Sequence, residues 1–220
     1  MKNLNVSLSR TVLIGLMVLL TSCVDKKKEE NGEAENHQEQ EMHDENMTDE
    51  HMNHDDKMMK EANNSMIEKS DLTVKESEIA SSLIEDYLKI KSALVNDDND
   101  SAQKAGKSFI NSIANFNFSK IEESEQKEVK EILDVMKNHA QHISESDIAE
   151  QRKHFAKINA DMKNLLKITG SDRMLYQQYC QMYNNNEGGA WLSENKEVKN
   201  PLFGSKMLKC GSIKQTITLK

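Results

Sequence analysis

Apolar residues recur at three- and four-residue steps through much of the chain after residue 72, which is the period of helices that face a core. The first such segment covers residues 74–95. One stripe of this segment consists of Ile79, Leu83, Tyr87, Ile90 and Leu94. The pattern therefore predicts a long amphipathic helix that begins near Val74.

Three further helices follow at short intervals. Asp100 or Ser101 can cap a second helix, in which Gly106 permits close approach of a neighbour. A third helix is predicted over residues 122–144, and a fourth runs from a cap at Ser146 to Gly170. Helices joined by short polar turns predict an up-down four-helix bundle within residues 72–220.

The pattern changes after Arg173. Residues 176–183, 190–193 and 213–219 are rich in aromatic and β-branched side chains, and the Asn-Gly-rich run 184–189 is a strong turn signal. We expect short strands or extended segments over one end of the bundle. The predicted fold is mainly α, with a small C-terminal β or irregular cap.

Residues 1–22 have the features of a targeting signal. Lys2 and Arg10 precede an apolar run, residues 11–20, that ends in Leu20-Thr21-Ser22-Cys23. This ending resembles a bacterial lipobox, which implies cleavage before Cys23 and lipidation of its thiol. Val24 follows in place of an inner-membrane retention signal, so we expect an exported lipoprotein that the lipid anchors in the outer membrane, on its periplasmic face or at the cell surface.

Residues 23–71 form an acidic segment that contrasts with the rest of the chain. Residues 24–71 hold 6 Lys against 16 Asp or Glu, a net charge of −10, whereas residues 72–220 hold 21 of each sign. The segment has too few apolar residues to form a core, so we expect a disordered arm. Neither residues 24–71 nor residues 72–220 carry a net positive charge that would suggest nucleic acid as a partner.

Histidine and methionine are concentrated in this arm. Their positions are His37, Met42, His43, Met47, His51, Met52, His54, Met58 and Met59. Imidazole and thioether groups suit copper and silver ions, and the neighbouring carboxylates attract cations. The alternative is a solvated spacer with an accidental composition.

The C-terminal region contains the two cysteines that remain if Cys23 carries lipid. Cys180 with Met182, and Met207 with Cys210, could together form a sulfur-rich site for Cu(I) or Ag(I). Alternatively, Cys180 and Cys210 form a disulfide, which export to an oxidising compartment favours. The sequence leaves both possibilities open.

Three histidines lie where the third predicted helix gives way to the fourth. His139 and His142 share a helical face, and an antiparallel return could bring His154 close to them. They are a weaker candidate metal site, because their spacing matches no recognised motif. The alternative is one core histidine, His139, with two exposed ones.

Several short motifs together resemble a known family. They are Tyr179-Cys180-Gln181-Met182, Gly189-Ala190-Trp191-Leu192-Ser193, Asn200-Pro201-Leu202-Phe203-Gly204, Met207-Leu208-Lys209-Cys210-Gly211, Arg152-Lys153-His154-Phe155 and His139-Ala140-Gln141-His142-Ile143. This succession resembles the bacterial domain of unknown function 3347 over most of residues 75–215. Members occur as exported lipoproteins and as C-terminal parts of heavy-metal efflux adaptors, so the resemblance implies a role with copper or silver and an efflux pump or adaptor as partner. The family's usual Cys-Pro-Met reads Cys180-Gln181-Met182 here.

No phosphate-binding loop, nucleophile elbow or zinc-protease motif occurs in the sequence, so we do not expect an enzyme. The sequence predicts an exported lipoprotein that binds or buffers Cu(I) or Ag(I) and assists efflux. The alternative function is a structural or adaptor-docking module without a metal role, with a Cys180–Cys210 disulfide. In that case Trp191, Tyr183 and Phe203 would be packing or interface anchors.

Overall fold

The computed structural model of the protein describes residues 71–220. The predicted signal peptide and all but the last residue of the predicted arm lie outside this part. In chain order the elements are β1 (Leu72–Val74), α2 (Ser81–Val95), α3 (Asn99–Ala114), the 3-10 turn η1 (Phe118–Lys120), α4 (Glu123–Glu145), α5 (Ile148–Thr169), β2 (Leu175–Cys180), α6 (Tyr183–Asn186), β3 (Gly189–Ser193), the 3-10 turn η2 (Gly204–Met207) and β4 (Ser212–Leu219).

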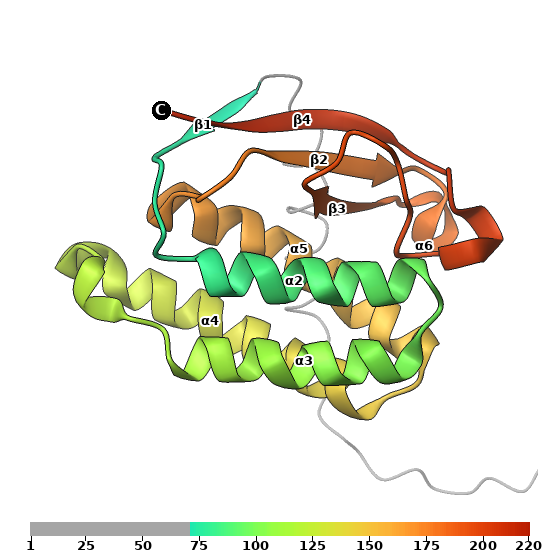
Figure 1. Cartoon of the computed structure of the whole chain (residues 1–220), viewed down its shortest axis with the longest axis horizontal. Coiled ribbons are helices and arrows are strands. Elements are labelled where there is room, and N and C mark those ends of the chain that lie inside the picture. Colours follow the sequence, from blue (N-terminus) through green and yellow to red (C-terminus); the bar gives the residue numbers. More distant parts are fainter. Residues whose placement is uncertain (1–70) are drawn as a thin grey trace, which may run out of the picture. The chain divides into compact units, whose positions relative to one another are not determined.

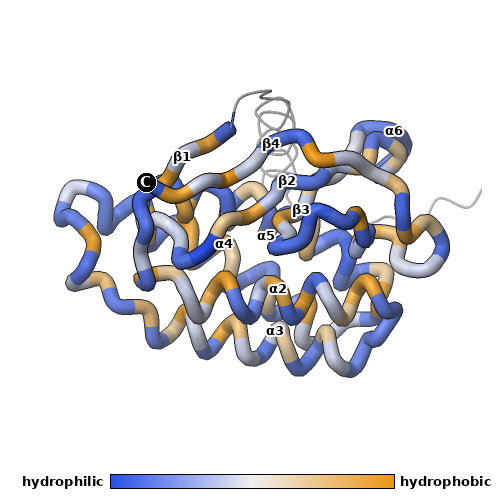
Figure 2. Tube along the Cα trace, turned by 45° about the horizontal axis from the view of Figure 1, so that its top comes forward, coloured by the Kyte–Doolittle hydropathy of each residue, from blue (hydrophilic) through white to orange (hydrophobic). Residues whose placement is uncertain are grey.

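The predicted mainly helical fold is confirmed. The long helices pack in sequence, α2 on α3, α3 on α4 and α4 on α5. A four-stranded sheet lies over the side formed by α2 and α5 (Figure 1). Hydrophobic residues recur at intervals along these helices between hydrophilic ones (Figure 2). Their inward side chains include Leu83, Phe109, Met136 and Phe155, which are at most 1% exposed. One hydrophobic core therefore joins the bundle to the sheet.

The close approach predicted at Gly106 occurs between α3 and α4. A Cβ atom at this position would lie 3.1 Å from Cγ2 of Ile143 and 3.2 Å from the Ala140 carbonyl oxygen. Both contacts are tighter than ordinary van der Waals packing, so glycine lets the two helices pack closely here.

The first helix begins later than predicted. Leu72, Thr73 and Val74 form a strand that pairs in parallel with residues 217–219 of β4, and α2 starts only at Ser81. The helical spacing of apolar residues extended through Val74, but pairing with a strand distant in sequence overrides that local pattern.

Two predicted helix caps are also shifted by a few residues. Asp98 caps α3 by accepting a hydrogen bond from the Ser101 amide, and Asp147 caps α5 by accepting from the Ala149 and Glu150 amides. Asp98 lies two residues before the predicted Asp100, and Asp147 lies one residue after the predicted Ser146; Asp is a common choice at this position. The predicted end of the fourth helix at Gly170 is confirmed, with φ at +79°.

The sheet has the strand order β1-β4-β2-β3. β4 pairs in parallel with β1 and antiparallel with β2, while β2 pairs antiparallel with β3, so the sheet is mixed. Trp191 of β3 is fully buried, and its indole N–H donates to Oε1 of Gln178 at 2.8 Å. The Gln178 amide nitrogen donates in turn to the Asn195 carbonyl at 2.9 Å, which fixes the segment after β3 to β2.

β3 is an edge strand, and α2 covers it. The amide of Leu192 donates to the Tyr87 hydroxyl oxygen at 2.9 Å, and that hydroxyl donates to Oδ1 of Asn159 on α5 at 3.2 Å. Burial raises the pKa of Tyr87, so the hydroxyl keeps its proton. Its ring stacks on Phe155 with centroids 4.9 Å apart. A single side chain thus connects two helices and the sheet.

One turn further along α2, Lys91 reaches the same strand. Its Nζ donates to Oγ of Ser193 at 3.0 Å, and burial lowers the pKa of its ammonium group.

No helix among residues 71–220 combines the length and apolarity required to cross a membrane.

We predict that Tyr87→Phe lowers the free energy of unfolding by about 2 to 3 kcal/mol, because it leaves the Leu192 amide and the Asn159 oxygen without their shared partner. Urea denaturation followed by circular dichroism measures this. Tyr179→Phe is the matched control: its hydroxyl donates to the Glu187 carbonyl at an exposed site, so its loss should cost less than about 1 kcal/mol. Equal losses in both variants would contradict the proposed connection.

Candidate functional site

The two cysteines of the described region form a disulfide. Cys180 at the end of β2 bonds to Cys210, which lies before β4, and their Cα atoms are 5.6 Å apart. Cys180 is fully buried. This is the second of the two possibilities that the sequence left open. In this form neither sulfur is a thiolate, and thiolate is the form that binds metal.

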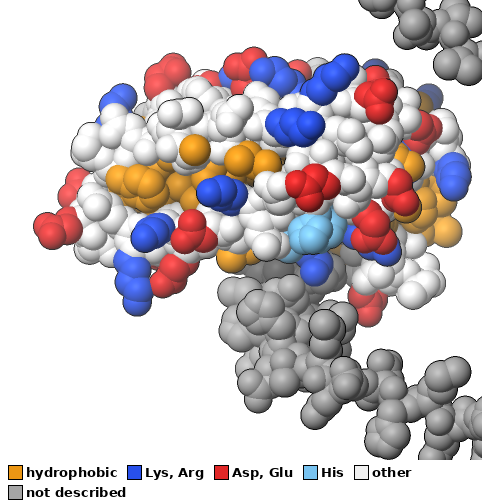
Figure 3. Space-filling view, turned by 90° about the horizontal axis from the view of Figure 1, so that it is seen from below, with side chains coloured by type: hydrophobic (Ala, Val, Ile, Leu, Met, Phe, Trp, Pro, Cys, Tyr) orange, Lys and Arg blue, Asp and Glu red, His pale blue; other side chains and the backbone are white. Residues whose placement is uncertain are grey.

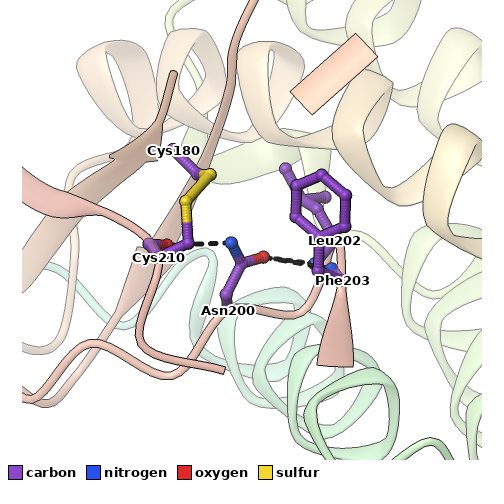
Figure 4. The surroundings of a disulfide bond; sticks show 5 residues. All are labelled: Cys180, Asn200, Leu202, Phe203 and Cys210. Atoms are coloured by element: carbon purple, nitrogen blue, oxygen red, sulfur yellow. Dashed lines mark hydrogen bonds between the residues drawn. A yellow bond between two sulfur atoms is a disulfide. The ribbon is translucent and has the colours of Figure 1, made fainter. Parts of the chain in front are cut away.

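Asn200 holds the loop beside the disulfide (Figure 4). Its Nδ2 donates to the Cys210 carbonyl at 2.8 Å, and its Oδ1 accepts from the amides of Leu202 and Phe203 at 2.8 and 3.2 Å. The Asn200 amide donates to the Leu208 carbonyl at 2.8 Å. Asn200 is fully buried, so this one side chain satisfies several backbone groups that would otherwise be left unpaired.

The two methionines of the predicted sulfur site differ in exposure. Met182 is 48% exposed, whereas Met207 is half-buried in η2 and its carbonyl accepts from the Cys210 amide at 2.9 Å. With the cysteines joined to each other, the site retains only two thioether donors. The four-sulfur arrangement is therefore not formed in the disulfide-bonded protein.

The three predicted histidines come together where α4 and α5 pack against each other. The Nδ1 atoms of His139 and His154 are 3.1 Å apart, and the ring of His142 stacks on that of His154 with centroids 4.2 Å apart. His139 is 7% exposed, while His142 is exposed. The antiparallel return that the sequence suggested thus brings all three imidazoles to one place.

The histidine cluster reaches the surface between charged side chains, as the view from below shows (Figure 3). Burial, and to a lesser extent the neighbouring His142 and Lys157, lower the pKa of His154 to about 4. Glu150 acts in the opposite direction. At neutral pH the His154 ring is therefore uncharged, which is the form in which imidazole binds a metal.

The cluster is not a complete metal site. Within residues 71–220, no group of three or more His, Cys, Asp or Glu side chains is arranged to hold a metal ion. His139 and His154 offer two nitrogen atoms that face each other, and His142 stacks instead of completing the set. The arm residues from His37 to Met59 lie outside the described part.

Two residues that position the C-terminal cap, Arg152 and Asp97, were not predicted to be functional from the sequence. The guanidinium of Arg152 on α5 pairs with Asp97 in the turn between α2 and α3, and its Nε donates to the Pro201 carbonyl at 3.0 Å. Hydrogen bonds from Ser205 and Arg152 lower the pKa of Asp97 to about 2.

Comparison with known proteins identifies part of the chain. Residues 83–174 match the family described as "Protein of unknown function (DUF3347)". The chain contains a DUF3347 domain. Searches among curated proteins and among solved structures found no match.

The matched residues end directly before β2, so they include the histidine cluster and Arg152 but not the disulfide. The DUF3347 domain thus corresponds to the helical part of the structure, and the sheet completed by β2, β3 and β4 follows it. The motifs from Tyr179 to Gly211 lie beyond the matched residues.

We predict no free thiol in the denatured, unreduced protein when Cys23 is replaced by Ser, as measured with a thiol-reactive dye. The double variant Cys180→Ala, Cys210→Ser should lose about 3 to 4 kcal/mol of unfolding free energy, because its unfolded chain is no longer restricted by a closed loop of 30 residues. Two reactive thiols in the unreduced protein would contradict the disulfide.

We predict that acid destabilises the metal-free protein through His154. Its pKa is lower in the folded than in the unfolded state, so its contribution is complete above pH 6.5 and is lost as the pH falls towards 4. Partial exposure limits the effect to about 1 kcal/mol. His154→Gln should flatten the dependence of unfolding free energy on pH in this window; an identical profile in both proteins would exclude His154 as its source.

Proposed function

We propose that this protein is an exported, non-enzymatic lipoprotein, anchored through Cys23, that binds or buffers copper or silver ions and assists their efflux. The observation that carries the proposal is the pair of facing Nδ1 atoms of His139 and His154, 3.1 Å apart, with His142 stacked beside them. In the described part of the chain this is where nitrogen donors from different helices meet.

The spacing of the two nitrogen atoms is compatible with shared coordination. An ion bonded to both atoms at about 2.0 to 2.1 Å would lie to one side of the line that joins them, so both rings would turn towards it. In the metal-free protein one Nδ1 donates its proton to the other, and an ion bound to both atoms would displace that proton. Two donors form only part of a coordination shell, and the His and Met residues of the arm are proposed as a separate set of ligands.

The disulfide changes which donors the folded domain can offer. With Cys180 and Cys210 bonded to each other, imidazole from the domain and thioether or imidazole from the arm are the ligands available. Both ligand types suit copper, and thioether favours the monovalent ions Cu(I) and Ag(I). An efflux pump or its adaptor subunit is the proposed partner, and the outer membrane is the proposed location.

The test is titration of the mature protein with Cu(I) and with Ag(I) against a competing chelator. We expect replacement of the four His and five Met of the arm by Gln and Leu to remove most of the bound ions. His139→Gln with His154→Gln should remove about one ion and abolish metal-induced thermal stabilisation of the domain. Lys130→Glu on the exposed face of α4 is the control and should bind as the wild type does.

Unchanged binding of both ions in the arm variant and in the histidine variant would contradict the proposed function. Loss in the arm variant alone would assign the ions to the arm and exclude the histidine pair.

The alternative function, a docking module without a metal role, is favoured by a different observation. The disulfide, Asn200 and Arg152 together fix the loop of residues 200–210 against α5, whereas the histidine pair lies between α4 and α5. A rigid loop of this kind provides a preorganised surface, which lowers the entropic cost of binding a partner.

A further inference from the structure

A small cavity of about 250 Å³ opens between the N-terminal half of α5 and the C-terminal cap. Two classes of side chain line it. The apolar and aromatic residues are Tyr183, Leu202 and Phe203, and the cationic residues are Arg152, Lys153 and Lys206. The rings of Tyr183 and Phe203 meet edge to face with centroids 6.0 Å apart.

The wall formed by Leu202 and Phe203 is rigidly held. Both backbone amides donate to Oδ1 of Asn200, which also binds the carbonyl of the disulfide-bonded Cys210 (Figure 4). The next turn is fixed as well, because the Ser205 amide donates to Oδ2 of Asp97 at 3.1 Å. The backbone of this wall is therefore preorganised.

The opposite wall is tied to the same loop. Nε of Arg152 donates to the Pro201 carbonyl, and the Tyr183 hydroxyl donates to the Arg152 carbonyl at 3.5 Å. Burial raises the pKa of Tyr183 to about 12, so its hydroxyl remains a hydrogen-bond donor at neutral pH. Three segments distant in sequence thus converge on one hollow.

Backbone strain accompanies the cavity. Asn184, which lines it, begins a run of three non-glycine residues with positive φ, at +48°, +54° and +69° for Asn184, Asn185 and Asn186. Such conformations cost roughly 1 to 3 kcal/mol each and persist where the surrounding structure enforces them, often beside binding sites.

The charges around the cavity favour a carboxylate ligand. Arg152 is paired with Asp97, and Lys153 with Glu150. Lys206 has no carboxylate within ion-pair distance among residues 71–220, so the lining keeps an excess of positive charge. The volume is smaller than that of a typical drug-sized ligand site, but it can hold one apolar side chain.

We propose that this cavity docks an acidic segment of a partner polypeptide, with one apolar side chain inserted beside Tyr183 and Phe203 and flanking carboxylates bound to Lys153 and Lys206. Charge complementarity and the size of the hollow carry this assignment. It does not rest on the proposed metal binding, and it assigns the cap a partner-recognition role.

The probe is a terminally blocked pentapeptide of four glutamates around a central leucine, titrated into isotopically labelled mature protein with a metal chelator present. We expect amide resonances of Tyr183, Phe203 and Lys206 to shift together with one saturating dissociation constant. Lys153→Glu with Lys206→Glu should weaken binding about tenfold, because each change replaces attraction by repulsion. Lys130→Glu on α4 is the matched control and should leave the affinity unchanged.

Two variant peptides determine whether the cavity recognises what we propose. A glutamine-for-glutamate peptide that binds equally well would exclude carboxylate recognition. A serine-for-leucine peptide that binds equally well would show surface attraction without insertion and would overturn the site. Shifts confined to other residues, or no shifts, would also overturn the proposal, and none of these outcomes affects the metal titrations.

Discussion

The buried hydroxyl of Tyr87 is the contact on which the arrangement of this fold depends. This hydroxyl accepts a hydrogen bond from the amide of Leu192 in the edge strand β3 and donates one to Asn159 of α5. The ring of Tyr87 stacks on Phe155. A sheet edge buried without a partner would leave its backbone groups unsatisfied, at a cost of several kcal/mol. Because α2 supplies that partner, the sheet is fixed on the bundle, and the C-terminal cap has a defined position relative to α5.

Much of this architecture could be predicted from local sequence, and the exceptions have identifiable causes. The recurrence of apolar residues at three- and four-residue steps predicted four helices, and the segments rich in β-branched and aromatic residues predicted the strands β2, β3 and β4. β1 was not predicted, and the first helix was expected to begin near Val74, because the pairing of β1 with β4 joins residues 145 positions apart and no local pattern reports such a contact. The caps Asp98 and Asp147 differ from the predicted residues only in the choice among neighbouring polar side chains.

The candidate sites show the same limit. The sequence indicated that Cys180 and Cys210 would meet, but it could not decide between a disulfide and a metal site, because both need the same proximity. It also placed His139 and His142 on one face, and the antiparallel packing of α4 and α5 added His154. The roles of Asn200 and Arg152 were not identified, since Asn200 binds backbone groups and Arg152 binds the Pro201 carbonyl and an Asp97 carboxylate 55 positions away, and neither leaves a local sequence pattern.

These observations divide the soft and borderline donors of the protein into two groups. The two domain sulfurs with the greatest metal affinity are joined to each other, whereas the imidazoles of the DUF3347 domain meet between two helices and include an uncharged His154 at neutral pH. In the proposed function, imidazole nitrogen of the folded domain and thioether sulfur of the arm would each bind metal ions. The disulfide instead stabilises a rigid cap beside a cationic, aromatic-lined cavity.

X-ray absorption spectroscopy at the copper edge, on unreduced protein whose arm His and Met residues have been replaced, tests the central claim of nitrogen donation most directly. The account predicts copper bound with imidazole scattering in its first shell and an intact Cys180–Cys210 disulfide. Copper surrounded by sulfur with the disulfide broken, or no bound copper at all, would contradict it.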